Sequence, residues 1–200
     1  MPERAPDELP TARLLLRRWR ADDHAPLAAI NGDPEVMRYI GSGALSRAAS
    51  DELVGRLEDE WRRCGHGLWA IERRADGRLL GFCGLAVPLF LSQVLPAVEV
   101  GWRLARDAWG HGYATEAAQA AVAAGWAIGL RQLIAIVHPD NERSLAVAER
   151  LGMRVTGRTR HAASGWEVLV LRLDRPPAPD DGERHRTFTG GGGGRPRAMR

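Results

Sequence analysis

Several short runs along the chain predict β-strands, either because apolar and polar residues alternate, as in residues 11–20, or because the run is apolar and bounded by turn residues. The runs cover residues 11–20, 68–71, 79–85, 98–104, 133–137, 154–160 and 166–173. An Asp76-Gly77 step separates the second and third runs, which is typical of a tight hairpin turn. The pattern therefore predicts about seven strands, two of which form a hairpin.

Between these runs, apolar residues recur at the three- to four-residue spacing of amphipathic helices. The segments with this spacing are 22–30, 35–40, 46–64, 113–129 and 141–151. In the longest, Leu53, Leu57 and Trp61 lie one turn apart and predict the buried face. Asp22 and Asp23 precede the first segment and are candidate N-caps. Strands and helices together predict an α/β fold.

The predicted elements fall within one domain over residues 11–175, preceded by an N-terminal extension over residues 1–10. Residues 176–200 are rich in proline, glycine, aspartate and arginine, with five consecutive glycines at 190–194. A segment of this composition lacks the apolar residues needed for a core, so we expect a disordered tail.

Composition and charge exclude several classes of function. The formal net charge is +3, and the tail carries five arginines against three acids, so no nucleic-acid surface is predicted. No apolar run approaches the roughly 20 residues of a membrane span, and the N-terminus lacks a signal-peptide pattern. We therefore expect a cytoplasmic protein without nucleic-acid or membrane partners.

The cationic and cysteine residues narrow the chemistry further. The sequence contains no lysine, so any phosphate site must use backbone amides or arginine. Cys64 and Cys83 have no CxxC spacing, which predicts two buried free thiols and no metal site.

A glycine-rich turn over residues 109–113, Trp-Gly-His-Gly-Tyr, leads directly into the predicted helix over 113–129. A helix start presents unpaired N–H groups, and glycine lets a phosphate approach the backbone, so a phosphate-bearing ligand is indicated. An ordinary glycine turn before a surface helix is the alternative. A dinucleotide fingerprint is disfavoured because Thr115 replaces its third glycine and no acid lies near Gln132.

With Gly110 and Gly112, this turn resembles the Gln/Arg-x-x-Gly-x-Gly/Ala pyrophosphate motif of the GNAT superfamily of N-acetyltransferases. The first motif position is Asp107 here, with Arg106 beside it, so the arginine or glutamine is displaced. Residues 109–117 are similar to the Trp-Gly-Lys-Gly-Tyr-Ala-Thr-Glu-Ala pattern of the ribosomal-protein N-terminal acetyltransferase (Rim-type) branch, with histidine in place of the lysine.

A second match lies at residues 138–144 and 149–153, which resemble the family's Asn-x-x-Ser and Leu-Gly-Phe elements. The resemblance spans residues 11–175 and implies the GNAT acyl-CoA N-acyltransferase fold, a central mixed sheet of about seven strands flanked by helices. In that fold the strands over 98–104 and 133–137 splay apart, so that the pantetheine arm of acetyl-CoA pairs with the first of them.

The resemblance implies acetyl-CoA as the acyl donor and a primary amine as the acceptor, either a protein N-terminal α-amine or a small molecule. The residues that it places against acetyl-CoA are Trp102, Leu104, Trp109, Gly110, His111, Gly112, Tyr113, Ala114, Thr115, Asn141 and Ser144. Asn141 also suits a helix N-cap, and Ser144 the first turn of that helix. In relatives, Met37, Tyr39 and the loop around Phe90 occupy regions that shape the acceptor pocket, although Met37 and Tyr39 also suit the core.

Amine acetylation requires a neutral nitrogen to attack the thioester and a proton for the departing thiolate. Glu99, an acid within an apolar strand, is the predicted base, acting directly or through water. A solvent-facing glutamate is the alternative. The tyrosine that protonates the thiolate in many relatives is Ala148 here, so Ser144 is the nearest candidate and a bound water the alternative.

Two functions are therefore compatible with the sequence. The first is an acetyl-CoA-dependent N-acetyltransferase that acts on a primary amine. The second is a non-catalytic acyl-CoA-binding regulatory module that has lost turnover, as Ala148 suggests. The amine, the preferred acyl chain and the formation of a homodimer stay open at this stage.

Overall fold

The computed structural model of the chain describes residues 4–41, 43–161 and 164–177. One eight-stranded sheet runs through it, in the order β1-β2-β3-β4-β5-β6-β8-β7. The strands are β1 (Glu8–Pro10), β2 (Leu14–Arg17), β3 (Leu68–Arg73), β4 (Leu79–Ala86), β5 (Glu99–Leu104), β6 (Gln132–Val137), β7 (Arg154–Arg160) and β8 (Glu167–Asp174).

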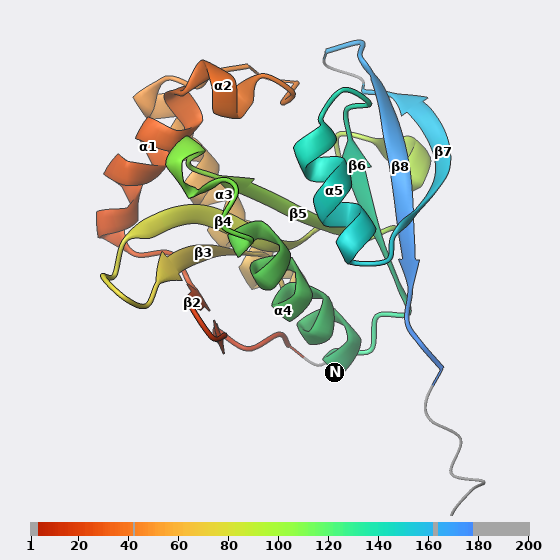
Figure 1. The fold of residues 1–200 in the computed structure, drawn as a ribbon, viewed down its shortest axis with the longest axis horizontal. Helices are drawn as coiled ribbons and strands as arrows, with labels where there is room; N and C mark the ends of the chain where they lie inside the picture. The colour runs from red at the N-terminus through yellow and green to blue at the C-terminus, as the bar shows by residue number, and fades with distance from the viewer. Residues whose placement is uncertain (1–3, 42, 162–163, 178–200) are drawn as a thin grey trace, which may run out of the picture.

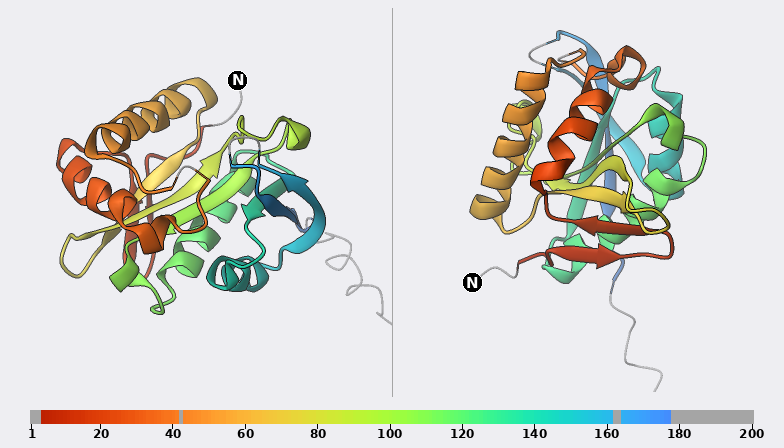
Figure 2. Two further views of the ribbon diagram at one scale, coloured as in Figure 1. Left: turned by 90° about the horizontal axis from the view of Figure 1, so that it is seen from above. Right: turned by 90° about the vertical axis from the view of Figure 1, so that its left-hand side faces the viewer.

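Helices cover both faces of this sheet. In the described residues they are α1 (His24–Gly32), α2 (Pro34–Met37), α3 (Arg47–Cys64), α4 (Tyr113–Ala127) and α5 (Glu142–Arg150). Helices α1 and α3 lie on one face, whereas α4 and α5 lie on the other (Figures 1 and 2). None of the helices in the described ranges is long and apolar enough to cross a membrane.

Neighbouring strands are antiparallel except for β5 and β6, which are parallel. Their register is limited to one pair, Glu99 opposite Ile134, and beyond it the two strands diverge (Figure 1). The mixed, splayed sheet implied by the sequence is therefore confirmed, with β1 as an additional strand. Because β1 pairs with β2 and Ala5 is buried, the sheet begins before residue 11, where the sequence pattern placed the start of the domain.

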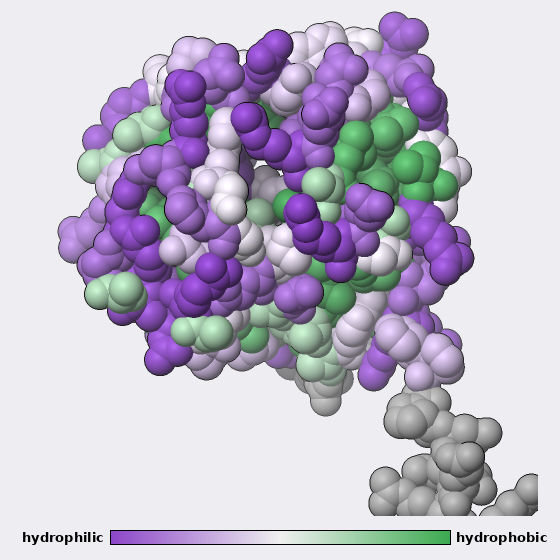
Figure 3. All heavy atoms as spheres, viewed as in Figure 1, coloured by the Kyte–Doolittle hydropathy of each residue, from purple (hydrophilic) through white to green (hydrophobic). Residues whose placement is uncertain are grey.

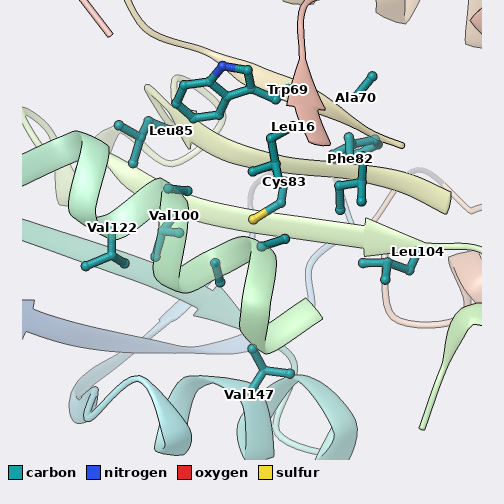
Figure 4. Packing of buried hydrophobic residues seen from close by; sticks show 14 of the residues in the cluster. Leu16, Trp69, Ala70, Phe82, Cys83, Leu85, Val100, Leu104, Val122 and Val147 are labelled. Carbon is teal, nitrogen blue, oxygen red and sulfur yellow. The ribbon is translucent and has the colours of Figure 1, made fainter. Parts of the chain in front are cut away.

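Apolar side chains fill the space between the sheet and the helices (Figure 4). Trp61 of α3 meets Trp69 of β3 edge to face, with ring centroids 4.9 Å apart, and both are fully buried. Cys83 lies in the middle of this core, where burial raises the pKa of its thiol. Cys64 is also a free thiol but is only half-buried, so the prediction of two buried thiols holds for Cys83 alone.

Helix α3 follows the predicted pattern closely. Its N-cap is Ser46, whose side chain accepts a hydrogen bond from the Ala49 N–H at 3.2 Å. The buried residues are Ser50, Val54, Leu57 and Trp61. Leu53 lies at the edge of this stripe and is half-buried, because the apolar face drifts around the helix over four turns.

Asp23 is the N-cap residue of α1, as predicted, but its side chain does not cap the helix. Asp23 is buried and accepts two hydrogen bonds from Arg17, at 2.7 and 2.8 Å, and its side chain makes no capping bond to α1. Arg17 also donates to Glu72 at 2.7 Å. A buried guanidinium is stable only when it is paired with carboxylates, so the Asp23 carboxylate binds Arg17 and not the start of the helix.

The described fold ends shortly after β8. The Arg175 N–H donates to the Arg131 carbonyl at 2.9 Å, which closes the sheet at this end. The predicted disordered tail over 176–200 lies, from residue 178 onward, outside the described residues.

Candidate active site

A cleft of about 810 Å³ opens between α2, the end of β5, the start of α4 and one side of α5. Figure 3 shows the hollow on this face of the molecule. The predicted site residues that line it are Trp102, Leu104, Trp109, Gly110, Gly112, Tyr113, Ala114, Thr115, Asn141 and Ser144. Glu99 and His111 are not among the lining residues.

The two glycines of the turn adopt backbone conformations that other residues adopt only with strain. The φ angle is +77° at Gly110 and +78° at Gly112. Gly112 is also the N-cap of α4, whose first N–H groups have no partner within the helix. Because Tyr113 and Ala114 line the cleft, the turn presents these donors and the positive end of α4 to it.

A charged network holds this turn against the segment before β2. Glu116, in the first turn of α4, accepts from the Thr11 hydroxyl at 2.6 Å and from Arg13 Nε at 2.7 Å. Arg13 Nη1 donates to the His111 carbonyl at 2.9 Å. A Cβ built at Gly112 would lie 3.5 Å from Arg13 Nη2, so this guanidinium stands directly beside the glycine turn.

The first position of the pyrophosphate motif is turned away from the cleft. Asp107 pairs with Arg78 at 2.5 Å and does not line the cleft. Trp109 is held from both sides instead: its Nε1 donates to the Leu104 carbonyl at 3.0 Å, and the Arg143 guanidinium lies 4.5 Å from its ring. Trp109 thereby connects β5 with α5 across the cleft.

Glu99 begins β5 at the point where β5 and β6 separate. Burial raises the pKa of its carboxyl to about 8, an effect that the Ile136 N–H opposes and that Glu60 reinforces. The contact with Ile136 places the carboxyl at the opening, because the strands no longer pair there. Its half-buried position and raised pKa disfavour the alternative of a freely solvated glutamate.

The two predicted proton-handling groups lie on opposite faces of the sheet. Side chains alternate along β5, so Glu99, Gly101 and Arg103 share one face. Arg103 donates to Asn31 of α1, which identifies that face as the α1 side. Ser144 belongs to α5, on the other face (Figure 1). The opening between β5 and β6 is the passage between them.

The start of α5 supplies the remaining predicted residues. Asn141 is the N-cap of α5, because its side-chain oxygen accepts a hydrogen bond from the Ser144 N–H at 3.2 Å. The capping role is therefore confirmed. Asn141 also lines the cleft. The Ser144 hydroxyl lines the cleft side of α5 and forms no hydrogen bond with the described part of the chain. Ala148 is fully buried in the core and is not a lining residue.

Comparison with known proteins decides the family. The Acetyltransferase (GNAT) domain family matches residues 13–154. The chain belongs to the GNAT acetyltransferase family. Its relative YkkB of Bacillus subtilis (strain 168) is 33% identical over 175 residues, which cover 86% of this chain and 96% of YkkB. The resemblance inferred from the two motifs is confirmed, and the chain is an acyl-CoA-dependent N-acetyltransferase.

Solved structures share the fold of this acetyltransferase. An acetyltransferase from Agrobacterium tumefaciens str. C58 has a TM-score of 0.73 and 29% identity, covering 84% of this chain and 94% of that chain. The spermidine N-acetyltransferase from Vibrio cholerae, solved in complex with CoA and spermine, has a TM-score of 0.66 and 16% identity. It covers 82% of this chain and 96% of that chain.

The residues predicted to shape the acceptor pocket lie in three different places: the cleft, the core and the exposed surface. Tyr39 lines the cleft and stacks on His138, with ring centroids 5.1 Å apart. Met37 is only 1% exposed, so for this residue the core alternative is confirmed. Phe90 is 45% exposed and packs against His161. Within the described ranges, no three His, Cys, Asp or Glu side chains form a group that could hold a metal ion.

Sequence reasoning missed all five arginines of the acetyltransferase that line the cleft, among them Arg13 and Arg103. Arg13 meets Glu116 across 103 residues of sequence, a contact without a local signature. Arg103 could have been predicted from the sequence. Glu99 was chosen because it is a charged residue within an apolar strand, and Arg103 is a charged residue on the same strand.

Proposed function

We propose that this cleft binds acetyl-CoA and that the chain transfers the acetyl group to a primary amine. One observation carries the proposal: the glycine turn and the part of β5 beyond its pairing with β6 line one cleft, and Glu99 lies where that pairing ends. The N–H groups of the turn can bind the pyrophosphate of the donor, and Glu99 at the opening can accept the proton of the attacking amine.

The charge of the cleft supports a polyanionic donor. Its walls carry five arginines against two glutamates: Arg13, Arg38, Arg103, Arg143 and Arg150 against Glu35 and Glu116. Arg13, beside Gly112, takes the cationic role at the pyrophosphate that Asp107 does not fill. The Vibrio cholerae enzyme of the same fold was solved with CoA, which agrees with this donor.

The edge of β5 supplies backbone groups for the pantetheine arm. Beyond Glu99 this edge has no register with β6, and Trp102 and Leu104 line the cleft there. An extended chain can add its polar groups to such an edge. Gly101 keeps the space beside Glu99 free, because a Cβ at this position would lie 3.9 Å from Glu99 Oε1.

Glu99, at the end of the pairing between β5 and β6, and Ser144, in the cleft, divide the proton transfers between them. Bound acetyl-CoA supplies the thioester carbonyl. Glu99 accepts the proton of the amine, directly or through water, and a pKa of about 8 suits a base that acts near neutral pH. Ser144 or a water molecule beside it donates the proton that the departing thiolate requires. Deprotonation and protonation thus take place on opposite sides of the opening.

A second candidate function rests on Ala148. Its buried position offers no hydroxyl to the cleft, which leaves the thiolate without the proton donor of many relatives. Family membership favours turnover, so a non-catalytic acyl-CoA-binding module would require that neither Ser144 nor water replaces this donor.

The two candidates differ in turnover. We would incubate the full chain with acetyl-CoA, succinyl-CoA and longer acyl-CoA donors against peptide and small-molecule amines, and detect products by mass spectrometry and released CoA thiol. Sustained CoA release with an acylated amine supports the enzyme. Donor binding by calorimetry without product for any pair supports the module.

A further inference from the structure

Arg103 is a largely buried cation without a charged partner. Its Nη1 donates to the neutral Asn31 at 2.7 Å, and its guanidinium lies 4.9 Å from the ring of Phe82. Its Nε is buried without a hydrogen-bond partner. Burial accordingly lowers the pKa of Arg103 to about 10.

The other buried arginine of the sheet shows the usual arrangement. Arg17 is 4% exposed and pairs with the carboxylates of Asp23 and Glu72. In the described part of the chain, no carboxylate lies within ion-pair distance of Arg103. Since burying an unpaired charge is costly, the environment of Arg103 is completed only when an anion binds.

The position of Arg103 indicates where that anion comes from. Arg103 lines the cleft near α2, on the strand face that carries Glu99 and Gly101. The phosphates of the donor already have a site at the glycine turn with Arg13. The face shared with Glu99 is the one from which the amine must reach its base, so an anion at Arg103 belongs to the acceptor.

We propose that Arg103 binds an acidic group of the acceptor, so that the preferred acceptor is a primary amine that also carries a carboxylate. The proposal rests on the transferase function above. Glu99 and Arg103 are four residues apart, which places their Cα atoms about 13 Å apart at about 3.3 Å per residue. The amine and the carboxylate are therefore separated by several bonds, as in a dipeptide or an ω-amino acid, and polycationic amines are disfavoured.

The first test needs no variant. We would compare Ala-Ala with its C-terminal amide, at saturating acetyl-CoA and with rates normalised to the neutral fraction of each amine. Hydrogen bonds to charged groups imply a kcat/KM at least about tenfold higher for the free acid. Equal values for acid and amide overturn this proposal while leaving the transferase function intact, whereas no transfer to any amine overturns both.

The second test assigns the preference to Arg103. Arg103→Gln should lower kcat/KM for the acid to the level of the amide, with much smaller changes in kcat/KM for the amide and in the KM for acetyl-CoA. Arg103→Lys should keep part of the preference. If Arg103→Gln does not fold, Arg103→Lys and the parent comparison still decide. Arg38→Gln is the matched control, because Arg38 is an exposed arginine on the same cleft.

Two outcomes of these variants overturn the assignment. A higher KM for acetyl-CoA in Arg103→Gln, with the acid preference retained, shows that the anion is the donor. An equal loss of preference in Arg38→Gln shows that the general charge of the cleft, and not Arg103, selects the acceptor.

Discussion

Glu99 and Arg103 are ionisable side chains on one face of β5, and among the described residues neither forms an ion pair. Burial shifts both pKa values toward the neutral form, upward to about 8 for Glu99 and downward to about 10 for Arg103. Arg17, by contrast, is paired with two carboxylates and has a raised pKa. Unpaired ionisable groups with shifted pKa values are typical of functional sites, whereas paired charges are typical of structural sites.

Glu99→Gln tests the base. Loss of a general base typically lowers turnover by about 100- to 10,000-fold, and we expect a deficit in this range near neutral pH. In the parent, kcat/KM should rise with pH through about 8, because the carboxyl loses its proton there. In the variant, the pH dependence of kcat/KM should reflect only the pKa of the amine. Its midpoint should therefore shift between two acceptors of different basicity. A loss below twofold would assign proton transfer to water.

The same substitution has a predictable effect on stability. The folded-state pKa of Glu99, about 8, lies above its unfolded value of 4.5, so the proton it keeps stabilises the fold fully below pH 4.5. That contribution is lost as the pH rises toward 8. Glu99→Gln should therefore gain stability relative to the parent between pH 5 and 8, measured by urea unfolding. A constant difference across this range would contradict the raised pKa.

At the scale of elements, we propose the start of α4 as the feature that binds the donor. Saturating acetyl-CoA, at about 100 times its dissociation constant, should stabilise the parent by about 2.7 kcal/mol in thermal unfolding. Gly112→Val should abolish this shift, because the side chain occupies the approach of the phosphate and strains a residue with φ of +78°.

Gly129 provides the control for this prediction. It lies just beyond the other end of α4, is exposed and has φ of +89°, so Gly129→Val carries comparable backbone strain away from the cleft. Both variants should lose stability without ligand. Only the Gly112 variant should lose the ligand-induced shift, and an equal shift in both would remove the pyrophosphate assignment.

The contact between Arg13 and the glycine turn predicts a donor-specific defect. Arg13→Gln should lower kcat/KM with acetyl-CoA by about 10- to 100-fold, the range of a hydrogen bond to a charged group. With acetyl-pantetheine, which lacks the pyrophosphate, the variant and the parent should be equal. Arg74→Gln is the control, since Arg74 donates to the Thr11 carbonyl nearby but does not line the cleft. A defect with both donors would indicate a structural role.

The elements that the sequence predicted well are those with a local signal. Periodicity predicted the bounds of β7 and nearly those of α3, and the glycine spacing predicted the turn before α4. The failures involve side-chain pairs, which periodicity does not specify. Arg17 binds the Asp23 carboxylate that the sequence pattern offers as a helix cap, although the two residues are only six positions apart. Arg13 and Glu116 are 103 residues apart, and neither shows a local sign of the other.

For the whole molecule, the sheet separates two chemical environments and connects them at one opening. The α4 and α5 side carries the glycine turn and Ser144, and the α1 side carries Glu99 and Arg103. The sequence indicated the residues on both sides of the sheet but not which residue lies on which side. Alternation along β5 separates its side chains into two sets, and only the neighbouring elements show which set faces α1. Under the proposed function, we therefore expect donor and acceptor to approach from different directions and to meet where β5 and β6 diverge.

Truncation after Arg175 tests whether residues 11–175, with the segment that forms β1, contain the complete function. The backbone bond from Arg175 to Arg131 is retained, and the removed residues 176–200 have no apolar periodicity with which to pack on the sheet. We expect the free energy of unfolding to change by less than about 0.5 kcal/mol and kcat/KM by less than about twofold. Urea unfolding and CoA release measure these two quantities. A severe loss of transfer with unchanged stability would show that the tail contacts the donor or the acceptor.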